Sequence, residues 1–157
     1  MGICTTTTRD DHEDTLASMA SLGNLYKQQR KYAEAEELLT EALAARRRQQ
    51  GDDHPDTLTS MNNLGMLYKQ QGKYTEAEEL LTEALAGSRK QLGDDQPETL
   101  NTPAEGNLGV VRIRQGGTAH AEGAAAVASV LARLQAPPHA LPETHAWVVK
   151  FRAALAP

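Results

Sequence analysis

The chain has 157 residues, of which 39% are apolar, 24% are charged and only 4% are aromatic, a composition typical of one helical domain. Its net charge of −5 argues against a nucleic-acid partner, because neutralising phosphates requires a net basic surface. The single cysteine excludes an internal disulfide, and no apolar run approaches the roughly 20 residues that cross a bilayer, so we expect a cytoplasmic protein.

The first ten residues are rich in threonine, and we expect residues 1–10 to be a disordered tail. They also fit the N-myristoylation pattern, with Gly2 followed by Thr6, and they place Cys4 as a candidate palmitoylation site. Two acyl chains give stable anchoring where one does not. The acidic residues that follow, such as Asp10, would be repelled by an anionic leaflet. We therefore expect no membrane partner and keep acylation as the alternative.

Residues 11–52 recur as residues 53–94 with about three-quarters of the sequence unchanged, which defines a repeat of 42 residues. Each copy predicts two helices, in the first copy at residues 14–29 and 32–49. The first helix carries apolar residues at three- and four-residue spacing, the period of an amphipathic helix: Leu16, Met19, Leu22 and Tyr26. The second helix has an apolar face of its own: Ala35, Leu38, Leu39, Ala42 and Leu43.

Glycines and charges support these two helices. Gly23 and Gly65 stand at the same place in both copies and predict close approach of the paired helix. Gly72 predicts the left-handed residue that closes the first helix of the second copy. Three basic residues, Arg46–Arg48, are expected to complement the dipole at the end of the second helix rather than to form a phosphate-binding patch.

A third copy, at residues 95–136, is degenerate. The segment Asn107–Gly109 matches Asn63–Gly65 with two residues added, which places Ala125 where the second copy has Leu81. Losing a large side chain at a packing site costs on the order of 2–5 kcal/mol where a void remains. Pro103 is expected to delay the start of this copy's first helix until after itself.

Residues 137–157 form a proline-rich linker and a last helix that we expect to cap the third copy. Its apolar residues fall on one face: Trp147, Val148, Phe151 and Leu155. The poorly packed segment Gly116–Leu134 favours self-association as an additional mode of interaction.

The second copy contains Met61-x2-Leu64-Gly65-x2-Tyr68, followed by Ala77-x3-Leu81. This pattern resembles the tetratricopeptide repeat, with Met where Trp is usual and Leu where Phe is usual. The extra length of each unit, and the phrase Asp53-His54-Pro55-Asp56 that leads to Asn62-Asn63-Leu64, look like the 42-residue repeats of kinesin light chains. The resemblance covers residues 11–100 well and the remainder only faintly.

This resemblance implies an all-α solenoid, a right-handed superhelix of helix–turn–helix repeats. It also implies a concave groove, lined by the first helices, that holds peptide segments of partner proteins. Of eleven differences between the two copies, four fall on one side of the first helix, at Ala17/Thr59, Ala20/Asn62, Ser21/Asn63 and Asn24/Met66. Either each copy contacts a different part of an extended ligand, or these positions drift because they are exposed.

We assign a candidate peptide-binding groove on this side of the first helices. Amide side chains can pair with a peptide backbone in both directions, and lysines favour an acidic segment. The candidate residues are Asn24, Lys27, Thr59, Asn62, Asn63, Met66, Lys69 and Gln70.

We expect no enzymatic activity, cofactor or metal. His12 and His54 precede helices at the same repeat position and are interpreted as capping or turn residues. The repeated glutamates, among them Glu36 and Glu78, are interpreted as a solvated helix face rather than as acid–base pairs. The sequence therefore predicts a scaffold or adaptor that binds a partner peptide; the alternative is a structural fragment of a longer kinesin light chain-like or signalling protein, without independent function.

Overall fold

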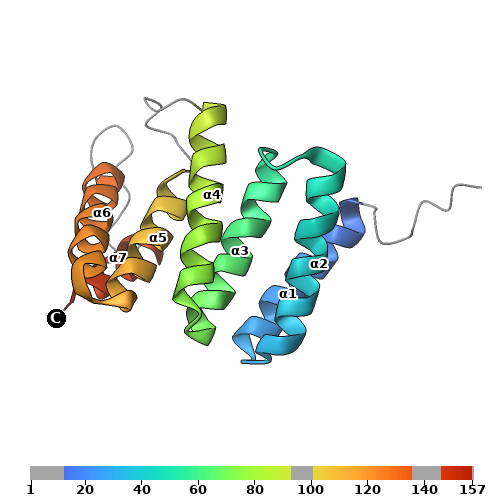
Figure 1. Cartoon of the computed structure of the whole chain (residues 1–157), viewed down its shortest axis with the longest axis horizontal. Helices are drawn as coiled ribbons and strands as arrows, with labels where there is room; N and C mark the ends of the chain where they lie inside the picture. The colour runs from blue at the N-terminus through green and yellow to red at the C-terminus, as the bar shows by residue number, and fades with distance from the viewer. Residues whose placement is uncertain (1–12, 93–100, 136–145, 157) are drawn as a thin grey trace, which may run out of the picture.

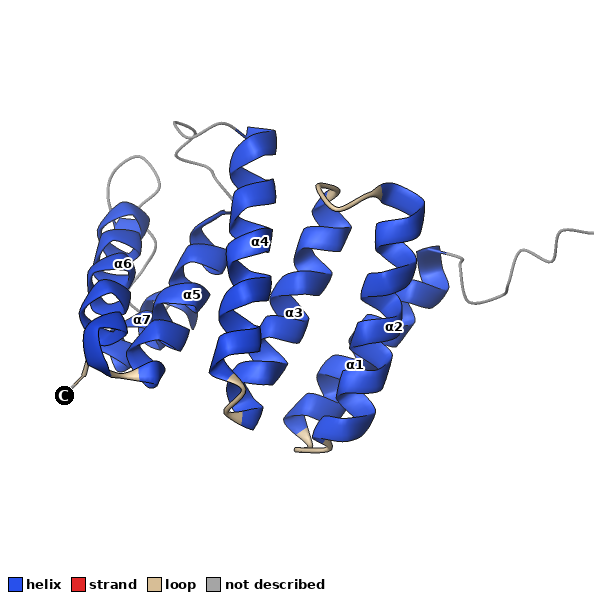
Figure 2. Ribbon diagram, viewed as in Figure 1, coloured by secondary structure: helices blue, strands red, loops and turns tan. Residues whose placement is uncertain are grey.

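A computed structural model describes residues 13–92, 101–135 and 146–156, and within these ranges the chain forms helices and no strand (Figures 1 and 2). The helix pairs α1–α2, α3–α4 and α5–α6 follow one another along the long axis of the molecule, and α7 lies beside α5 and α6 at one end (Figure 1). The predicted all-α solenoid is confirmed. The helix bounds are α1 Glu13–Gln28, α2 Tyr32–Gln50, α3 Pro55–Gln71, α4 Tyr74–Leu92, α5 Asn101–Gln115, α6 Gly117–Gln135 and α7 Ala146–Leu155.

Paired helices approach closely at a glycine, as the repeated glycines predict. A Cβ atom added at Gly23 of α1 would lie 2.8 Å from Cγ of Leu39 in α2. The same addition at Gly65 of α3 would lie 3.0 Å from Cγ of Leu81 in α4. Both leucines are almost fully buried. The absence of a side chain therefore lets a leucine of the second helix pack directly on the backbone of the first.

The third pair keeps this contact, and the predicted placement of Ala125 in it is wrong. A Cβ atom at Gly109 would lie 2.7 Å from Cγ2 of Val127, which is fully buried, whereas Ala125 is exposed. The packing register of α6 is therefore shifted by two residues from the sequence alignment. The larger apolar surface of Val127 explains the shift, since burying it is more favourable than burying an alanine.

The terminal helix α7 contacts α6 and α5 and caps the third pair, as predicted. Val148 and Phe151 are fully buried, and Phe151 lies against Gly106 of α5, where a Cβ atom would overlap its ring. Leu155, predicted on the same face, is 37% exposed because it lies in the last turn. The side chain of Trp147 lies outside the described residues.

Two further expectations are corrected. Helix α5 begins at Asn101, before Pro103 rather than after it. The first turn of a helix has no intrahelical partner for its N–H groups, so a proline there removes no hydrogen bond. Leu22, predicted on the buried stripe of the first helix, is 40% exposed. Its equivalent Leu64 is 3% exposed because α2 packs beside α3.

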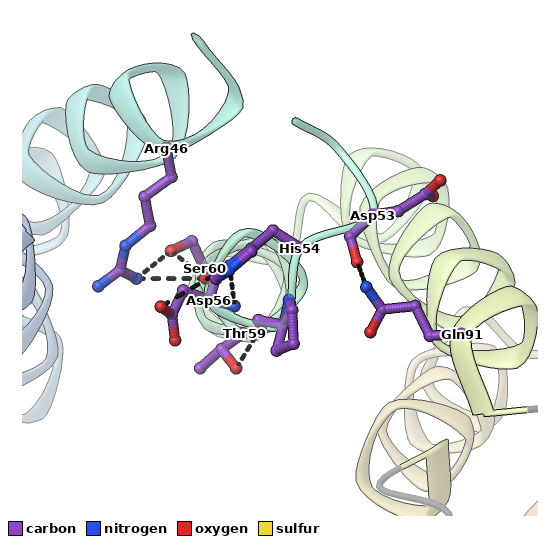
Figure 3. A network of polar contacts seen from close by, with 8 residues as sticks. Arg46, Asp53, His54, Asp56, Thr59, Ser60 and Gln91 are labelled. Carbon is purple, nitrogen blue, oxygen red and sulfur yellow. Dashed lines mark hydrogen bonds and ion pairs between the residues drawn. The ribbon is translucent and has the colours of Figure 1, made fainter. Parts of the chain in front are cut away.

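Polar contacts tie each second helix to the next first helix, which corrects the solvated role expected for Glu36 and Glu78. Arg46 is buried at the end of α2, and its Nη1 donates to Oγ of Ser60, 2.5 Å away in α3 (Figure 3). Glu36 accepts hydrogen bonds from Gln71 at 2.8 Å and from Lys73 at 3.1 Å. Glu78 accepts equivalent bonds from Arg112 and Gln115: the distances are 2.7 and 3.0 Å.

The capping role predicted for His54 is confirmed. His54 precedes α3 in an extended conformation, and its Nδ1 accepts a hydrogen bond from the backbone N–H of Asp56 at 3.3 Å (Figure 3). His12 lies outside the described residues.

The turns within the first two repeats use the same backbone hydrogen bonds but different residues. Lys31 N–H donates to the carbonyl of Tyr26 at 3.0 Å, and Lys73 N–H donates to the carbonyl of Tyr68 at 2.9 Å. The left-handed residue is Gly72 in the second repeat, as predicted, with φ 79°. In the first repeat it is Arg30, with φ 62°. Arg30 therefore carries backbone strain that glycine avoids.

We expect Arg30→Gly to raise the free energy of unfolding by about 0.5–1 kcal/mol, the relief of left-handed strain less the greater entropy of an unfolded glycine. Chemical denaturation measures the change. The matched variant, Gly72→Arg, should lower the free energy of unfolding by about 1 kcal/mol. Equal stabilities of Arg30→Gly and the parent chain would contradict the strain assigned to this turn.

Candidate binding face of the first helices

The candidate groove residues lie on the surface of α1 and α3 and not in the core. On α3, Asn62, Met66 and Lys69 follow one another at helical spacing and are half-buried. Thr59 and Gln70, at either end of this row, are exposed. Asn24, Lys27 and Asn63 are also half-buried. We call the row formed by Asn24, Lys27, Asn62, Met66 and Lys69 the first-helix face.

Several amides of this face are engaged within the chain. Asn107 of α5 is buried, and its Nδ2 donates to Oδ1 of Asn62 in α3 at 2.8 Å. Lys150 of α7 in turn donates to Oδ1 of Asn107. Within α1, Nζ of Lys27 donates to Oδ1 of Asn24 at 2.7 Å. The Asn62 oxygen is thus held by the neighbouring helix, which orients its amide.

Three lysines from three different helices lie close enough to affect one another: Lys27 of α1, Lys69 of α3 and Lys150 of α7. Burial lowers the pKa of Lys27. Burial, followed by the like charges of Arg114 and Lys27, lowers the pKa of Lys69. Burial, followed by the charges of Lys69 and Lys27, lowers the pKa of Lys150 to about 8.

This lysine cluster (Lys27, Lys69 and Lys150) is not neutralised by any acid of the part of the chain that the structure describes. Within the described residues, no carboxylate contributes to the pKa of any of the three lysines. Positive charges that are partly desolvated and unmatched form an electropositive site, because burial and mutual repulsion both disfavour their charged forms. An anion placed among them would relieve that cost.

Sequence reasoning found Lys27 and Lys69 but missed Lys150. Its position depends on how α7 packs against α5, which no repeat pattern specifies. The one available signal is its place between the buried residues Val148 and Phe151, since a lysine beside an apolar face often runs its stem along that surface.

Other predicted features fall outside this face or outside the described residues. Gly2 and Cys4, the candidate lipidation sites, lie outside the described ranges. In those ranges no helix is long and apolar enough to span a bilayer, and no three side chains of His, Cys, Asp or Glu gather as metal ligands would.

Two overlapping segments, residues 3–48 and 14–90, match the tetratricopeptide repeat family. A Podosopora anserina protein, described as a kinesin light chain of nearly identical TPR-like repeats, superposes with a TM-score of 0.69 at 27% identity, over 96% of this chain and 68% of its own. A variant of that protein gives a TM-score of 0.70. BtubC (BKLC) from P. vanneervenii gives 0.72 at 25% identity, over 87% of this chain and 53% of its own. No curated protein matches the chain.

The lysine cluster predicts an unusual titration. Lysine ¹³Cε NMR should give Lys150 a midpoint near pH 8, the pKa that burial and the neighbouring lysines impose. Lys69→Met should raise this midpoint, because it removes a like charge. The unfolded chain holds the Lys150 proton to higher pH, so this group makes stability rise with pH from about 8 to the unfolded value near 10.4.

The control is Lys90→Met, which removes an exposed lysine paired with Asp53 on another surface. It should leave the Lys150 midpoint unchanged. A Lys150 midpoint at the ordinary lysine value, or one insensitive to Lys69→Met, would show that the three ammonium groups do not share a site.

Proposed function

The chain belongs to the tetratricopeptide repeat family, and on that premise we propose that it is a cytoplasmic scaffold or adaptor that holds a segment of a partner protein in a groove along its first helices. Repeats of this family are generally protein-interaction modules. The observation that carries the proposal for this chain is the lysine cluster at the first-helix face, two of whose members lie on that face and the third on α7, with no matching carboxylate among the described residues.

The distribution of differences between the two copies supports this proposal. The residues that make the contact within each pair, Gly23 and Leu39, and the glutamate of the inter-repeat tie, Glu36, are the same in both copies. The first-helix face changes instead, from Ala20 and Asn24 to Asn62 and Met66. Such a division is expected when each copy keeps the scaffold and contacts a different part of an extended ligand.

The chemistry of the face favours an acidic partner segment. Carboxylates placed among Lys27, Lys69 and Lys150 would form charge-assisted hydrogen bonds, which are stronger than neutral ones. The Asn62 amide, oriented by Asn107, would pair with the backbone of the segment. Met66, half-buried between these polar groups, would accept an apolar side chain because its thioether is adaptable.

A second proposal is that the chain acts as part of a longer repeat protein. Its support is the coverage of the neighbours, since the chain spans 53% of BtubC and 68% of the Podosopora anserina protein. A reading frame that continues the 42-residue period beyond either end would favour it. Self-association also stays a prediction, and the apolar residues of the segment expected to mediate it are buried near α7: Val127, Val130 and Leu131.

The direct test is selection of peptides from a displayed random library on the full chain, followed by affinity measurement with single variants. We expect the selected peptides to be enriched in Asp and Glu. Lys69→Glu should weaken their binding at least about tenfold, because it places a like charge against them. Arg89→Glu makes the same charge change at an exposed site in the last turn of α4 and should leave binding unchanged.

If no peptide is selected above background, or if Lys69→Glu and Arg89→Glu weaken binding equally, the groove is not the binding site. The companion variants Asn62→Ala and Asn63→Ala separate backbone pairing from charge. Asn62→Ala should weaken every selected peptide, whatever its acidity.

Affinity for an acidic peptide should also depend on pH. Binding favours charged Lys150, whose pKa of about 8 in the free protein means that it loses its proton as pH rises from 7 to 9. Affinity should therefore fall across this range, whereas a peptide in which Asp and Glu are replaced by Asn and Gln should bind equally at both values. Lys150→Met should flatten the profile. An acidic peptide that bound more tightly at pH 9 would contradict this assignment.

A further inference from the structure

One side of α1 carries the same residues as the side of α3 that the neighbouring helix covers. We call it the open face of α1 and define it by Ser18, Leu22, Leu25, Gln29 and Lys31, which are identical to the α3-side residues Ser60, Leu64, Leu67, Gln71 and Lys73. Leu22 and Leu25 are 40% and 47% exposed, whereas Leu64 and Leu67 are 3% and 0% exposed. The same surface is therefore open in one repeat and buried in the next.

Local geometry is also the same on the two surfaces. Oγ of Ser18 donates to the carbonyl four residues earlier at 2.8 Å, as Oγ of Ser60 does at 2.9 Å. Nζ of Lys31 lies 5.4 Å from the ring centre of Tyr26, and Nζ of Lys73 lies 5.1 Å from that of Tyr68. The open face therefore presents its groups as they are presented in the covered copy.

The chain itself shows what covers such a surface. Against α3, the helix α2 places Glu36 on Gln71 and Lys73, and Arg46 on Ser60. Between them, Leu43 is buried in one cluster with Leu64 and Leu67. These three residues of α2 follow the spacing Glu-x6-Leu-x2-Arg.

The next interface uses the same arrangement with one change. Glu78 of α4 accepts from Arg112 and Gln115 of α5, and Leu85 is buried with Leu108 and Val111. At the place of Arg46 stands Ser88, whose hydroxyl donates to its own helix at Ala84. Since α5 has Ala104 where α3 has Ser60, the arginine is present only where its hydroxyl partner is present. The open face of α1 has the hydroxyl, Ser18.

We propose that the open face of α1 is a docking site for a helix of another protein that carries Glu-x6-Leu-x2-Arg. The glutamate pairs with Gln29 and Lys31, the leucine covers Leu22 and Leu25, and the arginine bonds the Ser18 hydroxyl. Charge is complementary at one end of the site, where an acid meets Lys31. At the other end the guanidinium meets the hydroxyl of Ser18 and the carbonyl of Asp14, the counterparts of the two groups that Arg46 contacts in α3.

The described helices of a second copy do not supply this occupant. Among the described residues, α2 is covered on the relevant side by α3, α4 by α5 and α6 by α7. Exposing any of them would require separating adjacent pairs, or α7 from the third pair. The occupant that we propose is a helix of a different protein, and its binding is independent of the peptide groove, which lies on another side of the same helices.

The test uses a synthetic helix with the sequence of residues 32–50 as the probe and the full chain as the receptor. A lactam between Glu37 and a lysine introduced by Glu41→Lys holds the peptide helical, because both positions are exposed in α2 and an isolated helix of this length is marginal in water. Fluorescence anisotropy of the labelled probe measures binding. We expect saturable binding that Leu25→Asp weakens at least about tenfold.

Leu155→Asp is the matched control, an exposed leucine on α7 at the other end of the solenoid, and it should leave probe binding unchanged. A charge reversal gives an independent readout. Lys31→Glu should weaken the parent probe, and a probe with Glu36→Lys should restore binding to the Lys31→Glu chain but not to the parent. This exchange identifies the face even if Leu25→Asp disturbs folding.

No binding of the probe to the parent chain would overturn the proposal. So would binding that Leu25→Asp and Lys31→Glu leave intact, because the probe would then have replaced α2 or docked elsewhere. Lys69→Glu should not affect the probe. The proposal of a docking site and the proposal of a peptide groove can therefore be contradicted independently of each other.

Discussion

The structure depends on one contact, a branched side chain of each second helix seated on a glycine of the first. Leu39 on Gly23, Leu81 on Gly65 and Val127 on Gly109 fix the distance and the rotation within each pair. Since interiors pack without voids, this fixed pairing also determines which residues face the next pair. The first-helix face, the inter-repeat ties and the open face of α1 all keep their places because each pair is set in the same way.

The contacts between pairs are less uniform, and they change by complementary substitution. The buried guanidinium of Arg46 donates a hydrogen bond to the hydroxyl of Ser60 (Figure 3). A buried charge needs such a partner, because leaving it unpaired would be strongly destabilising. At the next interface Ser88 and Ala104 replace both members, and none of the described side chains there buries a charge. The glutamate–glutamine tie is kept at both interfaces. The first interface is thus held by these polar contacts at both ends and the second at one end, and the middle of each is apolar.

Sequence reasoning was most successful where one residue's local chemistry decides the structure. Gly72 had to close a helix, His54 to cap one, and Gly23 to admit a neighbouring helix. Sequence reasoning failed where a residue's burial depends on an element far away in the sequence. Val127, and not Ala125, packs on Gly109, and Leu22 is exposed because no described helix covers it as α2 covers Leu64. The lysine cluster was likewise predictable only in the part that local sequence determines. Helical period places Lys27 and Lys69 on one side, whereas Lys150 joins them only through the packing of Phe151 on Gly106.

The identity between the open surface of α1 and the covered surface of α3 bears on how such a gene lengthens or shortens. The first unit can be duplicated in place without a mismatch, because Arg46 of its second helix meets a serine on either side, Ser18 of an added copy or Ser60 of the second unit. Unequal recombination by 42 residues within the first two units therefore keeps the residues at both seams complementary, whereas a step of any other length puts the wrong residues at a seam.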